Sequence, residues 1–580
     1  MLFLFFILPF KGTSLLPAVG YHVNLVYYIF FIIGLYSAAC FSSLLLKNSL
    51  PAIICTPFIL LFGILLISPL AVVLFLVSSS VFIFALSTIS VLAVVFVIFS
   101  FLTWQKAIVK DVSPVKIIFS TAIAVLLVSF AIHAIANLAA TQKLNKTIQQ
   151  AKAEGIKLTL QEIIPSPVPD KDNAAVIYQR AFDFADRLAA KYKKEREYMP
   201  YEGKIPIENL TPAQKNTISK IMKDQEFINL YALIERAVNL PSCRFDLKYE
   251  EGPAMLLPHL AKMRRLAKLT AARTYILIYQ GRYKESLESA KTGLLIGDSL
   301  ANEPILISQL VRIAMDQITT ESFQPLFDNF SYAISIKDYQ NIISEIDKKD
   351  KYVAKGLEGV PPLIGSYSFR FALGEIDIDF DDINARFSTG KKITDFADFM
   401  SYESSGTPWF YWKLYGSYLG RPILKEDYIF YIQSFSTLME LSQKPYFSVK
   451  NEISKWESKP LDTIFTKPKH PISSMTLPAL SRVLTQQARY NAILDTFKLA
   501  LALKIYKQKH GYYPDMLISL FPEVISQLPL DPFTGKDYIY RKEGRGFILY
   551  SIGRNEHDDN GVYDQKQLGK YDDIAWKVSN

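Results

Sequence analysis

The uneven distribution of charge is the feature that most constrains how this 580-residue chain folds. Residues 1–140 carry only five lysines and one acidic residue, Asp111, whereas the whole chain has 64 basic and 55 acidic residues. A helix that spans a membrane needs about 20 predominantly apolar residues. The sequence therefore predicts a transmembrane helical bundle over residues 1–140, followed by a mostly helical water-soluble region.

Four segments of this apolar part are long enough to span a membrane: 23–46, 52–77, 80–103 and 117–139. Whether residues 1–20 also span it is left open. Lysines are enriched in cytoplasmic loops, and residues 104–116 contain three of them. We therefore expect a multi-pass protein of the inner (cytoplasmic) membrane in contact with the lipid bilayer. Residues from about 141 onward would lie outside the cytoplasm.

The rest of the chain has nearly balanced charge, and the formal net charge of the whole chain is +9. Nucleic-acid-binding proteins gather basic residues on one face, and no such cluster is present, so no nucleic acid partner is expected. Cys40, Cys55 and Cys243 are too few for a disulfide framework or a thiolate metal site.

Residues 141–330 are predicted to form a helical soluble domain. Gly281 interrupts a long helical pattern, and Tyr283 follows it, which resembles the turn of a tetratricopeptide hairpin. Stable arrays need about three repeats, so we predict an ordinary helical hairpin, with a repeat-like region as the alternative. Residues 331–482 are predicted to be a less regular, mixed region. Acidic and apolar residues alternate at 375–382, and we predict that these carboxylates are solvated.

The C-terminal residues 483–580 have a different pattern. An apolar stripe at helical spacing runs through residues 483–509, at Tyr490, Leu494, Phe497, Leu501 and Ile505. Gly511 ends the helical pattern, and residues 538–541 and 546–551 are typical of two short strands joined by a turn. The sequence predicts a long helix followed by a small antiparallel sheet.

Six short motifs follow one another in this region: 501–506, 510–514, 528–532, 538–540, 549–553 and 572–574. Their order resembles the globular part of the major pseudopilin of type II secretion systems, over residues 490–578. The whole chain resembles bacterial polytopic membrane proteins that carry this module. The resemblance implies a small α+β module, with a long helix on a short antiparallel sheet and a calcium ion that fixes the last loop.

Oxygen-bearing side chains are concentrated between residues 555 and 573. Calcium takes six to eight oxygen ligands, and carboxylates from separate loop segments supply them. The pattern is not an EF-hand, because Gln567 stands where that motif has its last glutamate. We predict metal ligands at Asn555, Asp558, Asp559, Asp572 and Asp573. The resemblance places one family ligand on Asn555 and another on Asp572 or Asp573; a solvated acidic loop is the alternative.

No serine-hydrolase, zinc-protease, phosphate-loop or dinucleotide motif is present, and no catalytic or cofactor-binding residue is predicted. The four histidines after residue 140 are widely scattered: His259, His470, His510 and His557. We expect a membrane-anchored, exocytoplasmic envelope protein, without enzymatic activity, whose calcium-stabilised module contacts other envelope proteins. A permease-type transport component and an envelope hydrolase assembled by folding remain as alternatives.

Overall fold

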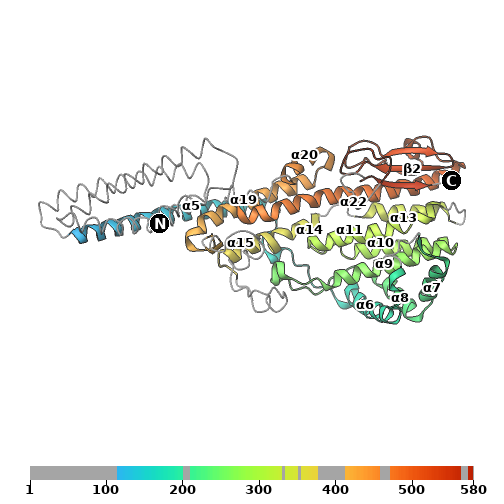
Figure 1. Ribbon diagram of the computed structural model, residues 1–580, viewed down its shortest axis with the longest axis horizontal. Helices are drawn as coiled ribbons and strands as arrows, with labels where there is room; N and C mark the ends of the chain where they lie inside the picture. The colour runs from blue at the N-terminus through green and yellow to red at the C-terminus, as the bar shows by residue number, and fades with distance from the viewer. Residues whose placement is uncertain are drawn as a thin grey trace, which may run out of the picture. The chain divides into compact units, whose positions relative to one another are not determined.

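The computed structural model describes residues 114–199, 209–328, 334–349, 354–376, 412–413, 415–457, 470–562 and 572–578. These residues are mostly helical and include one three-stranded antiparallel sheet (Figure 1). The chain divides into two compact units, and the second unit comprises residues 139–466 and 470–580. The features described below belong to this second unit unless stated otherwise.

The structure corrects the prediction of a membrane bundle. Among the described residues, no helix is both long enough and apolar enough to cross a membrane. The segments 23–46, 52–77 and 80–103 lie outside the described residues. The segment 117–139 lies in α5 (Pro114–Ala153), a single helix that continues through polar residues such as Lys143 and Lys146. The predicted inner-membrane location, with residues from about 141 onward outside the cytoplasm, is therefore not supported.

The helices that follow α5 begin at residues whose side chains or ring suit a helix start. The Asn173 side chain accepts a hydrogen bond of 3.1 Å from the Ala175 amide at the start of α6. Thr211 caps α7, and Pro212 occupies the first helical position, where no amide donor is needed. These helices are α6 (Ala174–Lys191), α7 (Pro212–Met222) and α8 (Gln225–Val238).

The predicted helical hairpin is confirmed. Helix α9 (Pro258–Tyr279) and helix α10 (Tyr283–Asp298) are joined through Gly281, whose φ of 72° is the left-handed conformation that glycine adopts most readily. Helix α11 (Leu306–Glu321) packs on both of them. A Cβ atom added at Gly293 would lie 2.7 Å from the Thr319 hydroxyl oxygen, so the small residue permits the close approach of α10 and α11.

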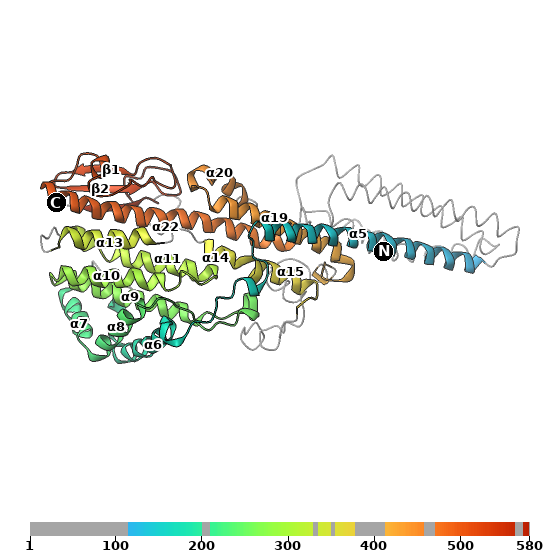
Figure 2. The same cartoon turned by 180° about the vertical axis from the view of Figure 1, so that it is seen from behind.

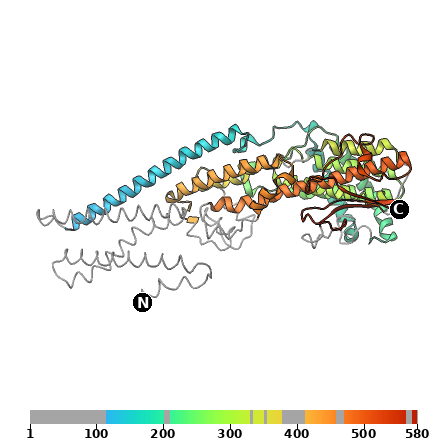
Figure 3. The ribbon, with the colours of Figure 1, turned by 90° about the horizontal axis from the view of Figure 1, so that it is seen from above.

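Further helices occupy the region between the hairpin and the C-terminal part of the chain. They are α12 (Gln324–Asp328), α13 (Ile336–Lys348), α14 (Ala354–Glu358), α15 (Ser366–Ala372), α19 (Arg421–Ser442) and α20 (Tyr446–Glu457). Helix α19 lies along the N-terminal part of α22 (Pro471–His510) (Figure 3). Residues 331–482 are therefore largely helical wherever the structure describes them.

The predicted helix over 483–509 is the C-terminal part of α22, which ends at Gly511 with a φ of 84°. The strands are β1 (Ile539–Glu543), β2 (Gly546–Ser551) and β3 (Ile574–Val578). They pair antiparallel in the order β1-β2-β3, with Leu549 opposite both Tyr540 and Trp576. The α+β arrangement expected at the C-terminus is thus present.

Helix α22 lies between the sheet and the helical layers (Figure 2). Phe497 on α22 packs against Trp576 of β3 at 5.4 Å between ring centroids, and against Phe323 from the α11–α12 segment at 4.9 Å. Residues 499–503 are completely buried. The sheet and the helical hairpins therefore share one hydrophobic core, which joins them through α22.

Candidate functional site

The predicted metal ligands lie in the loop that connects β2 to β3. The structure describes this loop at residues 552–562 and 572–573. Two of its residues that are not glycine, Glu556 and Asn560, have positive φ angles of 56° and 58°. Non-glycine residues adopt this conformation at a cost, and they do so where the surrounding structure imposes it. The Asp573 amide donates a hydrogen bond of 3.2 Å to the Val562 carbonyl oxygen and closes the loop.

Asp573 is the most deeply buried of the predicted ligands, with no exposed surface. Its Oδ2 atom accepts hydrogen bonds from the Gly561 amide at 2.7 Å and the Asp559 amide at 3.1 Å. Its buried Oδ1 atom has no hydrogen-bond partner among the described residues. Burial raises the pKa of Asp573 to about 6, and the negative charges of Asp559 and Asp558 contribute to the rise.

Asp558, Asp559 and Asn555 form the outer part of the loop site. Oδ1 of Asp558 accepts hydrogen bonds from the Tyr550 hydroxyl at 2.8 Å and from the Asn560 amide at 2.9 Å. The Asn555 amide group donates to Asp559 at 2.9 Å and holds the pKa of Asp559 below its usual value. The Asn555 oxygen accepts from the His557 amide at 3.0 Å, so this side chain supports the loop.

Asp572 takes part in a different set of interactions. Its Oδ1 atom accepts a hydrogen bond of 2.8 Å from the Arg489 guanidinium on α22, and its Oδ2 atom accepts from the Arg554 amide at 3.0 Å. One carboxylate oxygen therefore joins the loop to α22, and the other joins the two described parts of the loop to each other. Of the two positions that the sequence left open, Asp573 is the one with an oxygen available to a cation.

The described residues contain no group of three or more His, Cys, Asp or Glu side chains placed to hold a metal ion. Burial and the charges of Asp559 and Asp558 raise the pKa of Asp573, and its buried Oδ1 atom has no hydrogen-bond partner among the described residues. A calcium ion would neutralise the repulsion and satisfy that oxygen.

A second polar cluster lies in the core, and the sequence analysis did not find it. The Lys349 ammonium lies 2.9 and 3.0 Å from the two carboxylate oxygens of Asp316 and 3.0 Å from Asp298. The Tyr490 hydroxyl donates to Asp316 at 2.6 Å. These residues come from α11, α10, α22 and the end of α13, so only folding brings them together.

The structure contains a long helix packed on an antiparallel sheet at the C-terminus. The resemblance to a pseudopilin remains a prediction from the sequence motifs. Helix α22 contacts β2 and β3, and it also contacts α11, α13, α19 and α20. A comparison of the chain with protein-family models, with curated proteins and with solved structures found no match.

Proposed function

We propose that this protein is a non-enzymatic scaffold whose C-terminal module binds another protein. The observation that carries the proposal is a set of large apolar side chains exposed in the connection between α22 and β1. Five such side chains occur within residues 512–530, with exposed fractions of 48–64%. They are Tyr512, Met516, Ile518, Phe521 and Leu530. Concentrations of exposed apolar side chains mark protein interaction sites.

The attachment of the module supports a scaffold role. Lys498 of α22 pairs with Asp347 at 2.5 Å, and the buried Lys504 ammonium donates to the Phe327 carbonyl at 2.7 Å. These contacts, together with the shared core, fix the module to the helical region. A rigid connection of this kind presents a binding surface in one orientation, which reduces the entropy lost on association.

The catalytic alternative receives less support. Burial raises the pKa of the Cys243 thiol to about 12, so this thiol stays protonated at neutral pH and is a poor nucleophile. His510 pairs with the exposed carboxylate of Glu523, and the exposed ring of His557 pairs with Asp559. Exposed pairs of this type are common surface interactions.

The binding surface is tested by placing a charge on it. Ile518→Glu is expected to weaken partner binding by at least about tenfold, because burying an unpaired carboxylate in an apolar interface is costly. The matched control is Ile307→Glu, since Ile307 on α11 is 57% exposed and Ile518 is 56% exposed. Quantitative cross-linking and mass spectrometry of the full chain in its source cells provide the measurement.

Partners that cross-link to the wild type and to Ile307→Glu but are lost with Ile518→Glu would support the proposal. An identical set of partners for all three proteins would contradict it. Thermal melting of each variant establishes that the glutamate has not disturbed folding, which is expected because both isoleucines are exposed.

We also propose that calcium stabilises the β2–β3 loop through Asp573, whose buried Oδ1 atom has no hydrogen-bond partner among the described residues. At a calcium concentration 100 times the dissociation constant, binding is expected to raise the free energy of unfolding by about 2.7 kcal/mol. Asp573→Asn should abolish this increase, because it removes the charge of the central ligand. Thermal melting of the full chain in calcium chloride and in a chelator is the measurement.

The matched control for this experiment is Asp572→Asn. Asp572 is next to Asp573 in the chain, but both carboxylate oxygens of Asp572 accept hydrogen bonds, from Arg489 and from the Arg554 amide. We expect Asp572→Asn to lower the melting temperature and to leave the response to calcium intact. If the wild-type melting temperature does not change with calcium, the calcium proposal is wrong. The protein-binding proposal does not depend on this result.

A further inference from the structure

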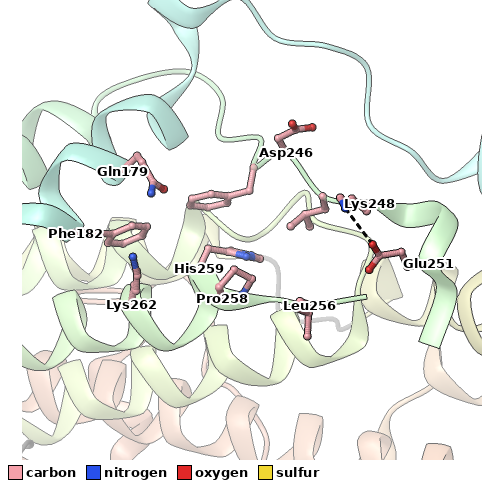
Figure 4. A pocket seen from close by; sticks show the side chains of 11 residues that line it. Gln179, Phe182, Asp246, Lys248, Glu251, Leu256, Pro258, His259 and Lys262 are labelled. Carbon is pink, nitrogen blue, oxygen red and sulfur yellow. Dashed lines mark ion pairs between the residues drawn. The ribbon is translucent and has the colours of Figure 1, made fainter. Parts of the chain in front are cut away.

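Among the described residues, a pocket of about 460 Å³ lies beside α6 and the start of α9 (Figure 4). Its lining combines the apolar side chains of Phe182 and Leu256 with charged side chains of both signs, such as Lys248 and Glu251. A lining of this kind selects no single class of ligand. The edge of the C-terminal sheet is more selective.

Strand β1 forms an edge of that sheet. It pairs antiparallel with β2, and the described residues contain no strand on its other side (Figure 2). The opposite edge strand, β3, is partly covered. Helix α12 packs against it, and the Gln324 side chain donates a hydrogen bond of 3.0 Å to the Lys577 carbonyl oxygen. An edge strand presents backbone N–H and C=O groups with which another extended chain can pair, so the edge at β1 suits an added strand.

The side chains of β1 alternate between the two faces of the sheet. Tyr540 is opposite Leu549, and Leu549 is opposite Trp576, so these three residues share one face. This is the face that packs on α22. Lys542 lies on the same face and Arg541 lies on the other, because successive residues of a strand point to opposite sides.

The face of β1 toward α22 adjoins the exposed apolar side chains of residues 512–530. The Tyr540 hydroxyl donates to the Pro514 carbonyl oxygen at 2.6 Å. The Lys542 ammonium lies 5.5 Å from the centre of the Tyr512 ring. Tyr512 is 53% exposed, and Met516, which follows two residues after Pro514, is 64% exposed. A strand added beside β1 would therefore have apolar surface available on this face.

The charged side chains of residues 541–545 are exposed, and three of the four are basic: Arg541, Lys542, Glu543 and Arg545. The Lys542 ammonium pairs with Asp515 at 3.1 Å, so its charge is partly neutralised. The Arg541 guanidinium instead bonds to the neutral side chain of Asn560 at 3.3 Å. Arg541 is therefore the basic residue on β1 best placed to attract a carboxylate.

The charge of this edge decides which strands can pair with it. Burial lowers the pKa of Lys507 on α22, and the positive charge of Arg545 adds to the effect, which indicates a positive potential at this end of the sheet. Opposite charges on neighbouring strands attract, and like charges directly opposite each other repel. Basic residues on an edge strand also oppose pairing with apolar or basic strands. The edge thus favours an acidic strand.

We propose that β1 binds an extended acidic segment of a partner protein, which adds to the sheet as a further strand. Backbone hydrogen bonds to β1 hold the segment, its apolar side chains pack beside Tyr512, and an acidic side chain lies opposite Arg541 on the other face. A segment with alternating apolar and acidic residues meets both requirements. This inference rests on the protein-binding function proposed for the module and specifies the chemistry of the partner.

The probe for the test is a short fluorescein-labelled peptide in which valine and glutamate alternate, and fluorescence anisotropy with the full chain measures its binding. One control peptide has lysine in place of each glutamate. Another keeps the glutamates but carries N-methyl groups on its backbone amides, which removes the hydrogen-bond donors. We expect each control peptide to bind at least about tenfold more weakly than the glutamate peptide. These comparisons use the wild-type protein and do not depend on the folding of a variant.

Arg541→Glu is expected to weaken binding of the glutamate peptide at least about tenfold, because like charges then face each other. The matched control is Lys536→Glu, since Lys536 is also basic and exposed but precedes β1 in the chain. It should bind the peptide as the wild type does. The inference is overturned if the glutamate peptide does not bind, if either control peptide binds as tightly, or if both variants weaken binding equally.

The cross-linking experiment separates this inference from the proposed function. Partners that are lost with Ile518→Glu and with Arg541→Glu support both. Partners that are lost with Ile518→Glu but retained with Arg541→Glu overturn the added strand and leave the protein-binding function in place. Sedimentation of the full chain tests for a second copy as the occupant, and a dimer that Arg541→Glu dissociates would also overturn the inference.

Discussion

Replacing Lys349 by methionine is expected to lower the free energy of unfolding by about 3–5 kcal/mol, because it removes the ammonium group that is hydrogen-bonded to the buried carboxylate of Asp316. Neither side chain of this pair has any exposed surface. The Lys349 ammonium also donates to the Leu294 carbonyl oxygen at 2.9 Å, and this hydrogen bond would be lost as well. Urea unfolding of the full chain provides the measurement.

The neighbouring lysine offers a matched control. Lys348 has the same charge and is 66% exposed, and it pairs with Glu345 at 3.1 Å on the surface. Lys348→Met is expected to change the free energy of unfolding by less than about 1 kcal/mol, since exposed ion pairs contribute little. If Lys349→Met and Lys348→Met are equally stable, the buried pair of Lys349 and Asp316 does not contribute to stability as proposed.

A double variant separates the loss of the pair from the cost of leaving one partner unpaired. Lys349→Met combined with Asp316→Leu removes both charges from the same buried site. We expect this protein to be more stable than Lys349→Met alone, because the remaining uncompensated charge is then absent. If the double variant instead loses as much stability as Lys349→Met and Asp316→Leu lose when added together, the two residues act independently.

Replacing Asp427 by alanine is expected to cost about 3 kcal/mol, because this fully buried side chain holds the first turn of α22. Its Oδ2 atom accepts hydrogen bonds from the Ile472 amide at 2.9 Å and the Tyr415 hydroxyl at 2.7 Å. Its Oδ1 atom accepts from the Ser473 amide at 3.3 Å. The variant leaves all of these buried donors without their acceptor.

The effect of Asp427→Ala is expected to depend on pH. Burial raises the pKa of Asp427 to about 6 from the ordinary value of 3.8, although hydrogen bonds from Ser473 and Tyr415 oppose the rise. The folded protein therefore holds this proton more tightly than the unfolded chain does. The contribution of Asp427 to stability is full below about pH 4 and declines as the pH rises through about 6.

Urea unfolding at about pH 4 and at neutral pH measures this difference. The wild type should exceed Asp427→Ala by more at the lower pH. The adjacent Glu426 is a control, because it is partly exposed and pairs with Lys143 on the surface at 2.8 Å. Glu426→Ala should cost less than about 1 kcal/mol. An Asp427→Ala penalty that grows with rising pH would contradict the assigned role.

Local chemistry explains where several elements begin and end. Asn173 and Thr211 cap helices because their side chains accept hydrogen bonds from nearby amides. Gly281 and Gly511 end helices because glycine tolerates positive φ. The strands β1 and β2 were likewise predicted from residues close together in the chain. Each of these features depends on neighbours within a few positions.

The membrane prediction was wrong because it also used the local sequence alone. A run of apolar residues indicates a preference for nonpolar surroundings over water, but it does not determine the length or composition of the helix that contains it. The structure places the segment 117–139 in a helix that continues to Ala153, and no described helix meets the requirements of a span.

The sequence by itself determined the local elements: the apolar stripe of α22, the turn at Gly281 and the crowding of carboxylates at 555–573. Only the tertiary structure decided that α22 is buried on both faces and that His259 pairs with Glu303. It also decided that Asp572 bonds to Arg489, whereas Asp573 has an oxygen without a donor among the described residues. The physical reason is distance along the chain. Caps and turns are made by neighbouring residues, whereas burial and the pairing of charges depend on which distant surfaces pack together.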